Sequence, residues 1–508
     1  MTETVSRAEY EKLLAQYGQL VEENKQLKEQ LNYLVRKLFG KSSEKTDLPE
    51  QGQISLFDED NSVFSQPETT GQQTETVTYT RKKKRTTRQE KIAAEVPVEE
   101  VVYTDDQAVC HNCQRELKPM GKSFVREQIR FVPAELHRER VFQTTYKCSY
   151  CEQHQEIYDK SSLHQAPVPK PVLAHSLATP SVIAQVAHNK YELYVPGYRQ
   201  LREFKQMGLT ISEPTIINWL NKSVTWLMPL ITCLKAELLS QRYLHGDETP
   251  CQVLREPNKK ASSESFLWLV CSARQNEHQI VYFEYHLSRS MQVVKSIFQD
   301  YDGHFLCDGL GSYNYLDERA ERSGCWAHLR RKFYESVTDG ETRNRGIAQE
   351  GLRQINDIFH SYYHPADSTR TKLINQIKAF FNWVRETSLH VLEKSKFGKT
   401  LYYALNQEVY LCRLLKDPNI ALDNNIAERH IRPAVMGRKN WLFSTSQTGA
   451  KTNAAFLTIV ETAKANGLNV RRYLEYLLEK LPQLPEFPTK EQLAPYLPWT
   501  KLVQETCH

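Results

Sequence analysis

The sequence contains no long apolar run. Its longest apolar stretches, such as residues 266–271, fall far short of the roughly 18 residues that a helix needs to cross a bilayer. The N-terminal segment MTETVSRAEY also lacks the apolar core of a signal peptide. These absences exclude a membrane protein, and we expect a cytoplasmic protein with no membrane partner and no secretory export.

The sequence also lacks a strong charge of either sign. It has 66 Lys and Arg against 61 Asp and Glu, and the net charge of +5 is too weak to indicate a partner. The sequence has 11 cysteines, an odd number that cannot all form disulfides within one chain. Because cytoplasmic thiols stay reduced, closely spaced pairs are interpreted as metal ligands and scattered cysteines as packing residues. The 508 residues, 40% hydrophobic and 25% charged, suit a folded protein of roughly three or four domains.

A heptad repeat occupies the start of the chain. Leucine fills the d positions and Asn24 fills an a position, which favours a parallel two-stranded coiled coil because other registers leave the asparagine amide unpaired. Residues 1–40 are therefore predicted to form a dimerisation helix of a homodimer or larger homo-oligomer. The alternative is an amphipathic helix packed on its own domain. The heptad residues are Tyr10, Leu13, Tyr17, Leu20, Asn24, Leu27, Leu31, Leu34 and Leu38.

Residues 41–96 are rich in Gln, Thr, Ser and Glu and poor in aliphatic residues. Such a segment buries too little surface to offset its ordering entropy, so it is predicted to be a flexible linker. A basic tract inside it suits sequence-independent contact with DNA phosphates, although a solvated charge run has the same composition. The tract consists of Arg81, Lys82, Lys83, Lys84 and Arg85.

Two Cys-x-x-Cys pairs follow, in a predicted module of residues 97–165. Two thiolates at this spacing reach one ion from a tight turn, and two pairs complete a closed tetrahedral site. The pattern predicts one structural Zn²⁺; the alternatives are His111 or His154 in place of one sulfur, or a coincidental cluster. The predicted ligands are Cys110, Cys113, Cys148 and Cys151.

Residues 166–240 are predicted to form a helical DNA-binding region. A helix over residues 198–207, a turn at Gly208 and a second helix capped by Ser212 resemble a helix-turn-helix. An ordinary helical hairpin with Trp219 in its core fits the same pattern.

Two carboxylates, Asp247 and Asp308, follow predicted strands in residues 241–332. Strand, strand, strand, helix, strand is the order that opens an RNase-H-like α/β domain. If the first and fourth strands are neighbours, the two aspartates lie side by side at the carboxyl edge of the sheet. The elements between them are strands at residues 266–273 and 279–286 and a helix at residues 288–300.

A third carboxylate, Glu428, is predicted on a helix capped by Asp423 or Asn424. The residues before this helix are mostly helical in pattern, which predicts an inserted helical domain. The boundaries are residues 333–420 for the insertion, 421–460 for the rest of the core and 461–508 for a small C-terminal segment.

Three converging carboxylates can hold two Mg²⁺ ions, because hard cations prefer oxygen ligands. Basic residues near Glu428 are predicted to position DNA phosphates, and the alternative is a surface network of ion pairs with Asp423 and Glu428. The basic residues are Arg429, Arg432, Arg438 and Lys439.

Several motifs, in one order, closely resemble the insertion-sequence-sixty-six family of bacterial DDE transposases. The resemblance covers nearly the whole chain and implies that Asp247, Asp308 and Glu428 are the catalytic triad. It leaves open the chemical role of the motif that contains Cys325 and His328. The matching segments are residues 39–45, 246–250, 324–331, 423–433 and 437–443.

The resemblance implies a multidomain α/β protein whose RNase-H-like core, with its helical insertion, follows a coiled coil, a zinc module and a helical DNA-binding region. It implies Mg²⁺-dependent cleavage at the terminal inverted repeats of an insertion sequence, followed by attack of the freed 3′-hydroxyl on target DNA. The need for other proteins of the same element as partners is left open, and the nucleoid is the expected location. Two alternatives stay open: a non-catalytic dimeric DNA-binding regulator, and an RNase-H-like nuclease without strand joining.

Overall fold

The computed structural model describes residues 135–147, 163–366 and 368–508. The predicted coiled coil, basic tract and paired cysteines lie outside the described residues. The first described elements are two short antiparallel strands, β1 (Thr145–Lys147) and β2 (Leu163–Gln165). None of the helices within the described ranges has the length and apolarity needed to cross a bilayer.

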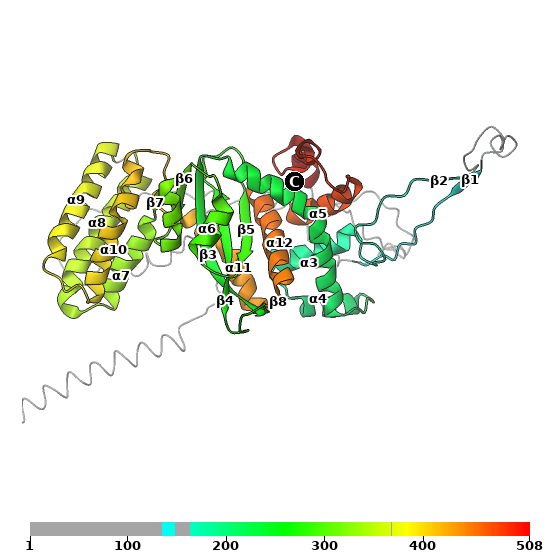
Figure 1. Cartoon of the computed structure of the whole chain (residues 1–508), viewed down its shortest axis with the longest axis horizontal. Coiled ribbons are helices and arrows are strands. Elements are labelled where there is room, and N and C mark those ends of the chain that lie inside the picture. The colour runs from blue at the N-terminus through cyan, green and yellow to red at the C-terminus, as the bar shows by residue number, and fades with distance from the viewer. Residues whose placement is uncertain (1–134, 148–162, 367) are drawn as a thin grey trace, which may run out of the picture. The chain divides into compact units, whose positions relative to one another are not determined.

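Three helices precede the main sheet and include the predicted helix-turn-helix (Figure 1). The turn contains Gly208, whose φ of +92° lies in the region that glycine adopts without strain. Ser212 precedes the second helix as predicted, but its hydroxyl bonds the Thr215 hydroxyl at 2.9 Å rather than a backbone N–H. Trp219 is buried in the core. The helices are α3 (Pro180–Tyr191), α4 (Gly197–Gln206) and α5 (Glu213–Leu239).

The main sheet has the strand order β5-β4-β3-β6-β7. Strand β4 is antiparallel to both β3 and β5, whereas β6 is parallel to both β3 and β7. Strand β8 adds in parallel to the far end of β3. The strands are β3 (Tyr243–Arg255), β4 (Glu264–Ser272), β5 (Val281–His286), β6 (His304–Cys307), β7 (Glu321–Gly324) and β8 (Ser444–Ser446).

Strand β3 is longer than the sequence pattern predicts. We expected it to end at the carboxylate of Asp247, but it continues to Arg255, so the carboxylate lies inside the strand. The extension exists because β4 pairs with β3 as far as Gln252 and β8 pairs beyond that point, at Val253 and Arg255. The apolar run in β4 has the expected place, between β3 and β5.

The two faces of the sheet are covered by different helices. On one face, Phe298 of α6 (Met291–Phe298) packs edge-on against Phe305 of β6, and Tyr313 of the 3₁₀ helix η3 (Gly311–Glu318) packs against Trp268 of β4. The helix α11 (Asn425–Trp441) packs against β3 and β4. Successive side chains of β3 point to opposite faces of the sheet, so neighbouring residues of this strand face different helices.

The edge strand β5 is covered by α12 (Gln447–Ala465). The backbone N–H groups of Val281 and Phe283 donate to the hydroxyls of Thr462 and Thr458, at 3.0 and 2.9 Å. The same hydroxyls also reach back to the carbonyl groups of these two residues, at 3.0 and 3.5 Å. Backbone groups at the edge of the sheet are thus satisfied by side chains instead of another strand.

Four packed helices are inserted between β7 and α11 (Figure 1). The insertion begins earlier than the predicted residue 333, because its first helix starts at Trp326 directly after β7. Thr369 and Ser395 cap the third and fourth helices by accepting backbone N–H groups. The elements are α7 (Trp326–Thr338), η4 (Thr342–Asn344), α8 (Arg345–Tyr363), α9 (Arg370–Ser388), α10 (Lys396–Leu411) and η5 (Arg413–Leu415).

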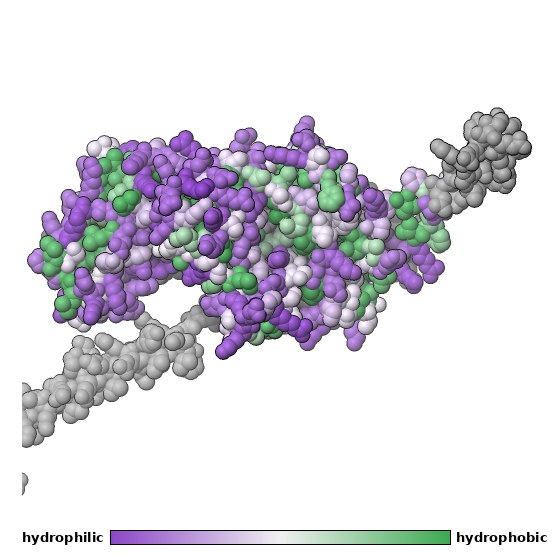
Figure 2. Space-filling view, in the orientation of Figure 1, coloured by the Kyte–Doolittle hydropathy of each residue, from purple (hydrophilic) through white to green (hydrophobic). Residues whose placement is uncertain are grey.

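The C-terminal segment packs on the helices before the sheet, mainly through α13 against α3. The face in Figure 2 is largely hydrophilic, with smaller hydrophobic areas between. The remaining elements are α13 (Val470–Lys480), η6 (Leu481–Gln483), α14 (Lys490–Leu493), η7 (Ala494–Tyr496) and α15 (Lys501–Cys507).

Candidate active site

Asp247 and Asp308 come from neighbouring parallel strands. The last paired residues of these strands are His245 and Leu306, and each aspartate lies two residues beyond this pair. Asp308 follows the last residue of β6, and its Oδ1 accepts the N–H of Leu310 at 2.9 Å. The two strands are therefore neighbours, which is the condition under which the aspartates were expected to lie side by side.

Gly246 is required where β3 passes β6. A Cβ on this residue would lie 2.2 Å from the ring of Phe305 and 3.2 Å from the carbonyl oxygen of Leu269. Only a residue without a side chain lets Phe305 pack directly beneath the strand at the position before Asp247.

Glu248 follows Asp247 but belongs to the opposite face of the strand. Its Oε2 accepts the hydroxyl of Tyr313 at 2.8 Å, and its Oε1 contacts the guanidinium of Arg289. Its side chain is 1% exposed. Glu248 is thus fixed on the side of η3, whereas Asp247 shares the side of His245 and α11.

The N-terminus of α11 is tied to β3 through Asn424. Its side-chain amide donates to the carbonyl of Gly246 at 2.8 Å, and its Oδ1 meets Nδ1 of His245 at 3.0 Å. Because Oδ1 is an acceptor, this contact makes Nδ1 of His245 the protonated nitrogen. Burial lowers the pKa of His245 to about 4, which keeps the ring neutral.

The two predicted capping residues have different roles. Asn424 occupies the N-cap position, but its side chain bonds β3 instead of the helix. Asp423 accepts the N–H of Asn425 at 3.1 Å and the hydroxyl of Tyr363 from α8. The start of α11 is therefore held by both the sheet and the insertion.

The start of α7 contacts the same segment. The thiol of Cys325 accepts the N–H of Asn424 at 3.2 Å, and the N–H of Trp326 donates to the carbonyl of Leu422 at 3.1 Å. Burial raises the pKa of Cys325. The start of the insertion thus packs directly on the turn that precedes Glu428.

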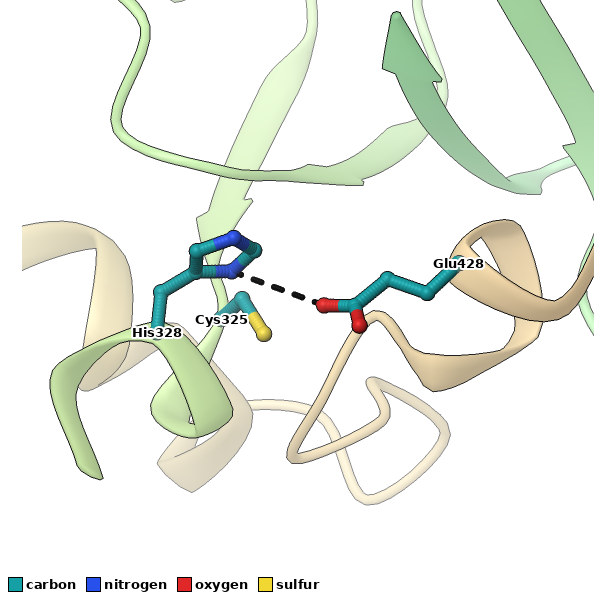
Figure 3. Close-up of side chains that lie close together, drawn as sticks. All are labelled: Cys325, His328 and Glu428. Atoms are coloured by element: carbon teal, nitrogen blue, oxygen red, sulfur yellow. Dashed lines mark ion pairs between the residues drawn. The ribbon is translucent and has the colours of Figure 1, made fainter. Parts of the chain in front are cut away.

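Glu428 faces α7 (Figure 3). Its Oε1 lies 3.9 Å from Nδ1 of His328, and its Oε2 lies 3.7 Å from Nη2 of Arg331. Cys325, His328 and Glu428 each place a potential ligand atom within 4.8 Å of the others. Nδ1 of His328 and Oε1 of Glu428 are buried and have no hydrogen-bond partner among the described residues.

The three predicted acids influence one another electrostatically. Burial and the neighbouring carboxylates Glu248, Asp308 and Glu428 raise the pKa of Asp247 well above its usual value. Burial lowers the pKa of His328, against the opposing effect of the Glu428 and Asp308 carboxylates. The arrangement therefore concentrates negative charge at one buried edge of the sheet.

The insertion also approaches the loop that contains Asp308. A Cβ on Gly309 would lie 2.9 Å from the ring and the hydroxyl of Tyr403 in α10. The ammonium group of Lys332 in α7 lies 4.6 Å from the centre of the same ring. Two helices of the insertion thus border this acidic edge.

The predicted basic residues of α11 differ in their surroundings. The guanidinium of Arg438 contacts the carbonyl of Pro250 in β3, and Nε of Arg429 donates to the carbonyl of Asn425 at 3.3 Å. Arg432 is half-buried, whereas Lys439 is exposed. Their contact with DNA stays a prediction.

Sequence reasoning missed His245, named Asn424 only as a possible helix cap and left His328 without a role. His245 and Asn424 connect β3 to α11, and His328 faces Glu428 from a helix far away in the chain. The alternation of β3, which places His245 on the same face as Asp247, was the available signal for the first of them.

Residues 175–452, which hold all three acids, match the family described as "Transposase IS66 family". The match covers more than half of the chain. The chain belongs to the IS66 transposase family.

Three further IS66 matches cover most of the rest of the chain. Residues 107–152 match the "zinc-finger binding domain of transposase IS66", and this segment contains both Cys-x-x-Cys pairs. Residues 458–499 match the "IS66 C-terminal element". A leucine-zipper element described as "Transposase C of IS166 homeodomain" matches residues 26–101. A zinc site and a zipper-like segment therefore have support from the family as well as from the residue patterns.

Three similar proteins come from Sinorhizobium fredii (strain NBRC 101917 / NGR234). The uncharacterized protein y4jD is 25% identical over 424 residues, which is 80% of this chain and 80% of its own length. The uncharacterized protein y4qI is 27% identical over 66% of this chain and 65% of its own length. The uncharacterized protein y4hP is 23% identical over 79% of this chain and 74% of its own length.

Proposed function

We propose that this IS66-family chain is a DNA transposase that uses Asp247, Asp308 and Glu428 as its catalytic acids. The observation that carries the proposal is that each aspartate lies two residues beyond the paired His245 and Leu306 of adjacent parallel strands, with Glu428 on a helix bonded to Gly246. The strand order, three antiparallel strands followed by two parallel ones, supports an RNase-H-like core.

The donor set fits two Mg²⁺ ions, because all three groups are carboxylates and hard cations prefer oxygen ligands. Burial and the neighbouring carboxylates raise the pKa of Asp247, and a bound cation would relieve the repulsion between these carboxylates. When bound, divalent ions supply Lewis acidity at phosphate oxygens. The carboxylates would hold the ions, and the fixed start of α11 sets the direction from which Glu428 approaches.

The proposed substrates are the terminal inverted repeats of an insertion sequence and a target DNA. Water attacks a phosphodiester at the element end, and the freed 3′-hydroxyl then attacks a target phosphodiester. Basic residues of the linker and of α11 are proposed to hold phosphates. These are Arg81, Lys82, Lys83, Lys84, Arg85, Arg429, Arg432, Arg438 and Lys439.

We further propose that Cys110, Cys113, Cys148 and Cys151 hold one structural Zn²⁺ and that the N-terminal heptads pair two chains. The helix-turn-helix of α4 and α5 is proposed to contact DNA. Other proteins encoded by the same element are candidate partners. The protein is proposed to act at the nucleoid.

The decisive experiment compares Asp247→Asn with Asp302→Asn in cleavage and strand-transfer assays on paired element ends. Asp247→Asn keeps the size of the side chain but removes the charge, so both reactions are expected to disappear while binding to the ends persists. Asp302 is an exposed aspartate and its variant is expected to behave like the wild type. Strand transfer by Asp247→Asn would refute the assignment. Cleavage without joining by the wild type would favour an RNase-H-like nuclease, and binding alone would favour a regulator.

A further inference from the structure

The Cys-x-x-His motif at the start of α7 is placed beside the third proposed acid. Cys325 immediately precedes α7, and His328 and Arg331 lie one and two turns along it. Figure 3 shows the imidazole of His328 and the carboxylate of Glu428 directed toward each other, with the thiol of Cys325 beside them. The motif therefore has a structural partner that lies far away in the sequence.

Each carboxylate oxygen of Glu428 faces a different residue of α7. His328 approaches Oε1 and Arg331 approaches Oε2, at 3.9 and 3.7 Å. The first distance is too long for a hydrogen bond, yet both atoms are buried and lack a hydrogen-bond partner among the described residues. Buried polar atoms without partners are costly, so a small closure of this gap is favoured.

The backbone on both sides of the gap is held in place. The N–H of Asn424 bonds the thiol of Cys325, and the N–H of Trp326 bonds the carbonyl of Leu422. The first turn of α7 and the residues before α11 are therefore fixed against each other. Any closure must come from the side chains of His328 and Glu428.

We propose that His328, assisted by Arg331, is a positioning residue that holds the Glu428 carboxylate toward Asp247 and Asp308. The inference rests on the proposed function, because it assumes that Glu428 is a metal ligand. A glutamate side chain has several rotamers, and donors facing both oxygens restrict it to few of them. Each oxygen still has a further lone pair that can face a cation. The first helix of the insertion thereby becomes part of the acid site.

The test measures Mn²⁺ affinity of the full-length protein by electron paramagnetic resonance. His328→Ala is expected to weaken binding roughly 10- to 100-fold, the usual effect of losing a residue that supports a ligand. His328→Asn places an amide N–H near the position of Nδ1 and is expected to restore most of the affinity. In a Glu428→Gln background, His328→Ala should cause no further loss, because its effect passes through the carboxylate.

Arg331→Ala and Arg330→Ala form a matched pair on the same helix. Arg330 hydrogen-bonds Asn356 at 2.7 Å and lies over the ring of Phe359, so its guanidinium is bonded to α8. Arg331→Ala is expected to weaken Mn²⁺ binding and Arg330→Ala to leave it unchanged. Thermal melting of each variant separates loss of the fold from loss of metal binding.

Three outcomes would overturn the inference. Unchanged Mn²⁺ affinity in His328→Ala would show that His328 does not position Glu428. If His328→Asn loses as much Mn²⁺ affinity as His328→Ala, the His328 side chain only fills space. Loss of one zinc equivalent in both Cys325→Ser and His328→Ala would make the cluster a soft-metal site instead. A different variant tests the proposed function. If Asp247→Asn keeps wild-type Mn²⁺ affinity, the assignment of the three acids as metal ligands is wrong.

Discussion

The side-chain amide of Asn424 donates a hydrogen bond to the carbonyl of Gly246 at 2.8 Å. This bond joins the helix that contains Glu428 to the strand that contains Asp247, one residue before the aspartate. The distance between two proposed catalytic acids therefore depends on an amide that is not itself one of them.

Asn424→Ala is expected to weaken both the fold and the proposed catalytic site. It removes the bond to Gly246 and the bond to His245, both buried, so the free energy of unfolding should fall by about 1–3 kcal/mol. Cleavage should also slow, because the start of α11 loses its hydrogen bonds to β3. Urea unfolding and end cleavage measure the two effects. Asn419→Ala is the control, since Asn419 is exposed, and equal behaviour of the two variants would contradict the role of Asn424.

Gly246→Ala is expected to destabilise the sheet by roughly 1–3 kcal/mol through overpacking. The added methyl would lie 2.2 Å from the ring of Phe305, which is fully buried and has little freedom to move. Denaturant titration measures the loss, and a second change, Phe305→Leu, should recover part of it. At Gly311 an added Cβ meets nothing within 4 Å, so Gly311→Ala should cost far less. A comparable loss in both alanine variants would argue against the clash.

Glu284 is expected to make the free energy of unfolding depend on pH in the acidic range. Burial would raise the pKa of its carboxyl group, but hydrogen bonds from His286, Lys235 and Tyr282 lower that pKa from 4.5 to about 2. A lowered pKa stabilises the folded state above pH 4.5, and this contribution is lost as the pH falls from 4.5 toward 2. For a carboxylate that is 27% exposed, the contribution is about 2 kcal/mol.

The corresponding measurement compares wild type with Glu284→Gln in urea at pH 7, 4.5 and 3. The stability difference should be largest at pH 7 and shrink toward pH 3. Glu335→Gln, at an exposed position on α7, serves as the control. A constant difference at all three pH values would show that the charge of Glu284 is not responsible.

Purified full-length protein is expected to contain about one zinc per chain, since two Cys-x-x-Cys pairs fill a tetrahedral site. Cys113→Ser should release this zinc. Cys412→Ser should retain it, because Cys412 is a half-buried free thiol of the described region. Elemental analysis decides the matter. A metal-free wild type, or equal zinc in both variants, would exclude the site.

Local patterns were sufficient to predict most elements of the core. The apolar run of β4, the helix that became α6 and the strand before Asp308 all have signals within a few residues of sequence. Their order suggested an RNase-H-like arrangement, in which the adjacency of β3 and β6 was a condition and not a deduction. The short strand β7 was missed, because its sequence ERSG has neither apolar alternation nor β-branched residues.

The contacts that assemble the site could not be predicted in the same way. The strand was expected to end at the carboxylate of Asp247, but β3 continues because β4 still pairs with it and Arg438 bonds the carbonyl of Pro250. The contact between His328 and Glu428 joins residues 100 positions apart, and no local pattern specifies that distance. Such features depend on how α7 and α11 pack, which is a property of the complete fold.

The hydroxyls of Thr458 and Thr462 on the β5 edge have a consequence for self-association. An exposed edge strand is a template on which a strand of another molecule can add, and it is a common origin of aggregation. Here the outward N–H groups of Val281 and Phe283 are already bonded within the chain. Two copies of this protein are therefore prevented from joining their sheets through this part of the edge, and pairing is left to other surfaces, such as the predicted N-terminal zipper.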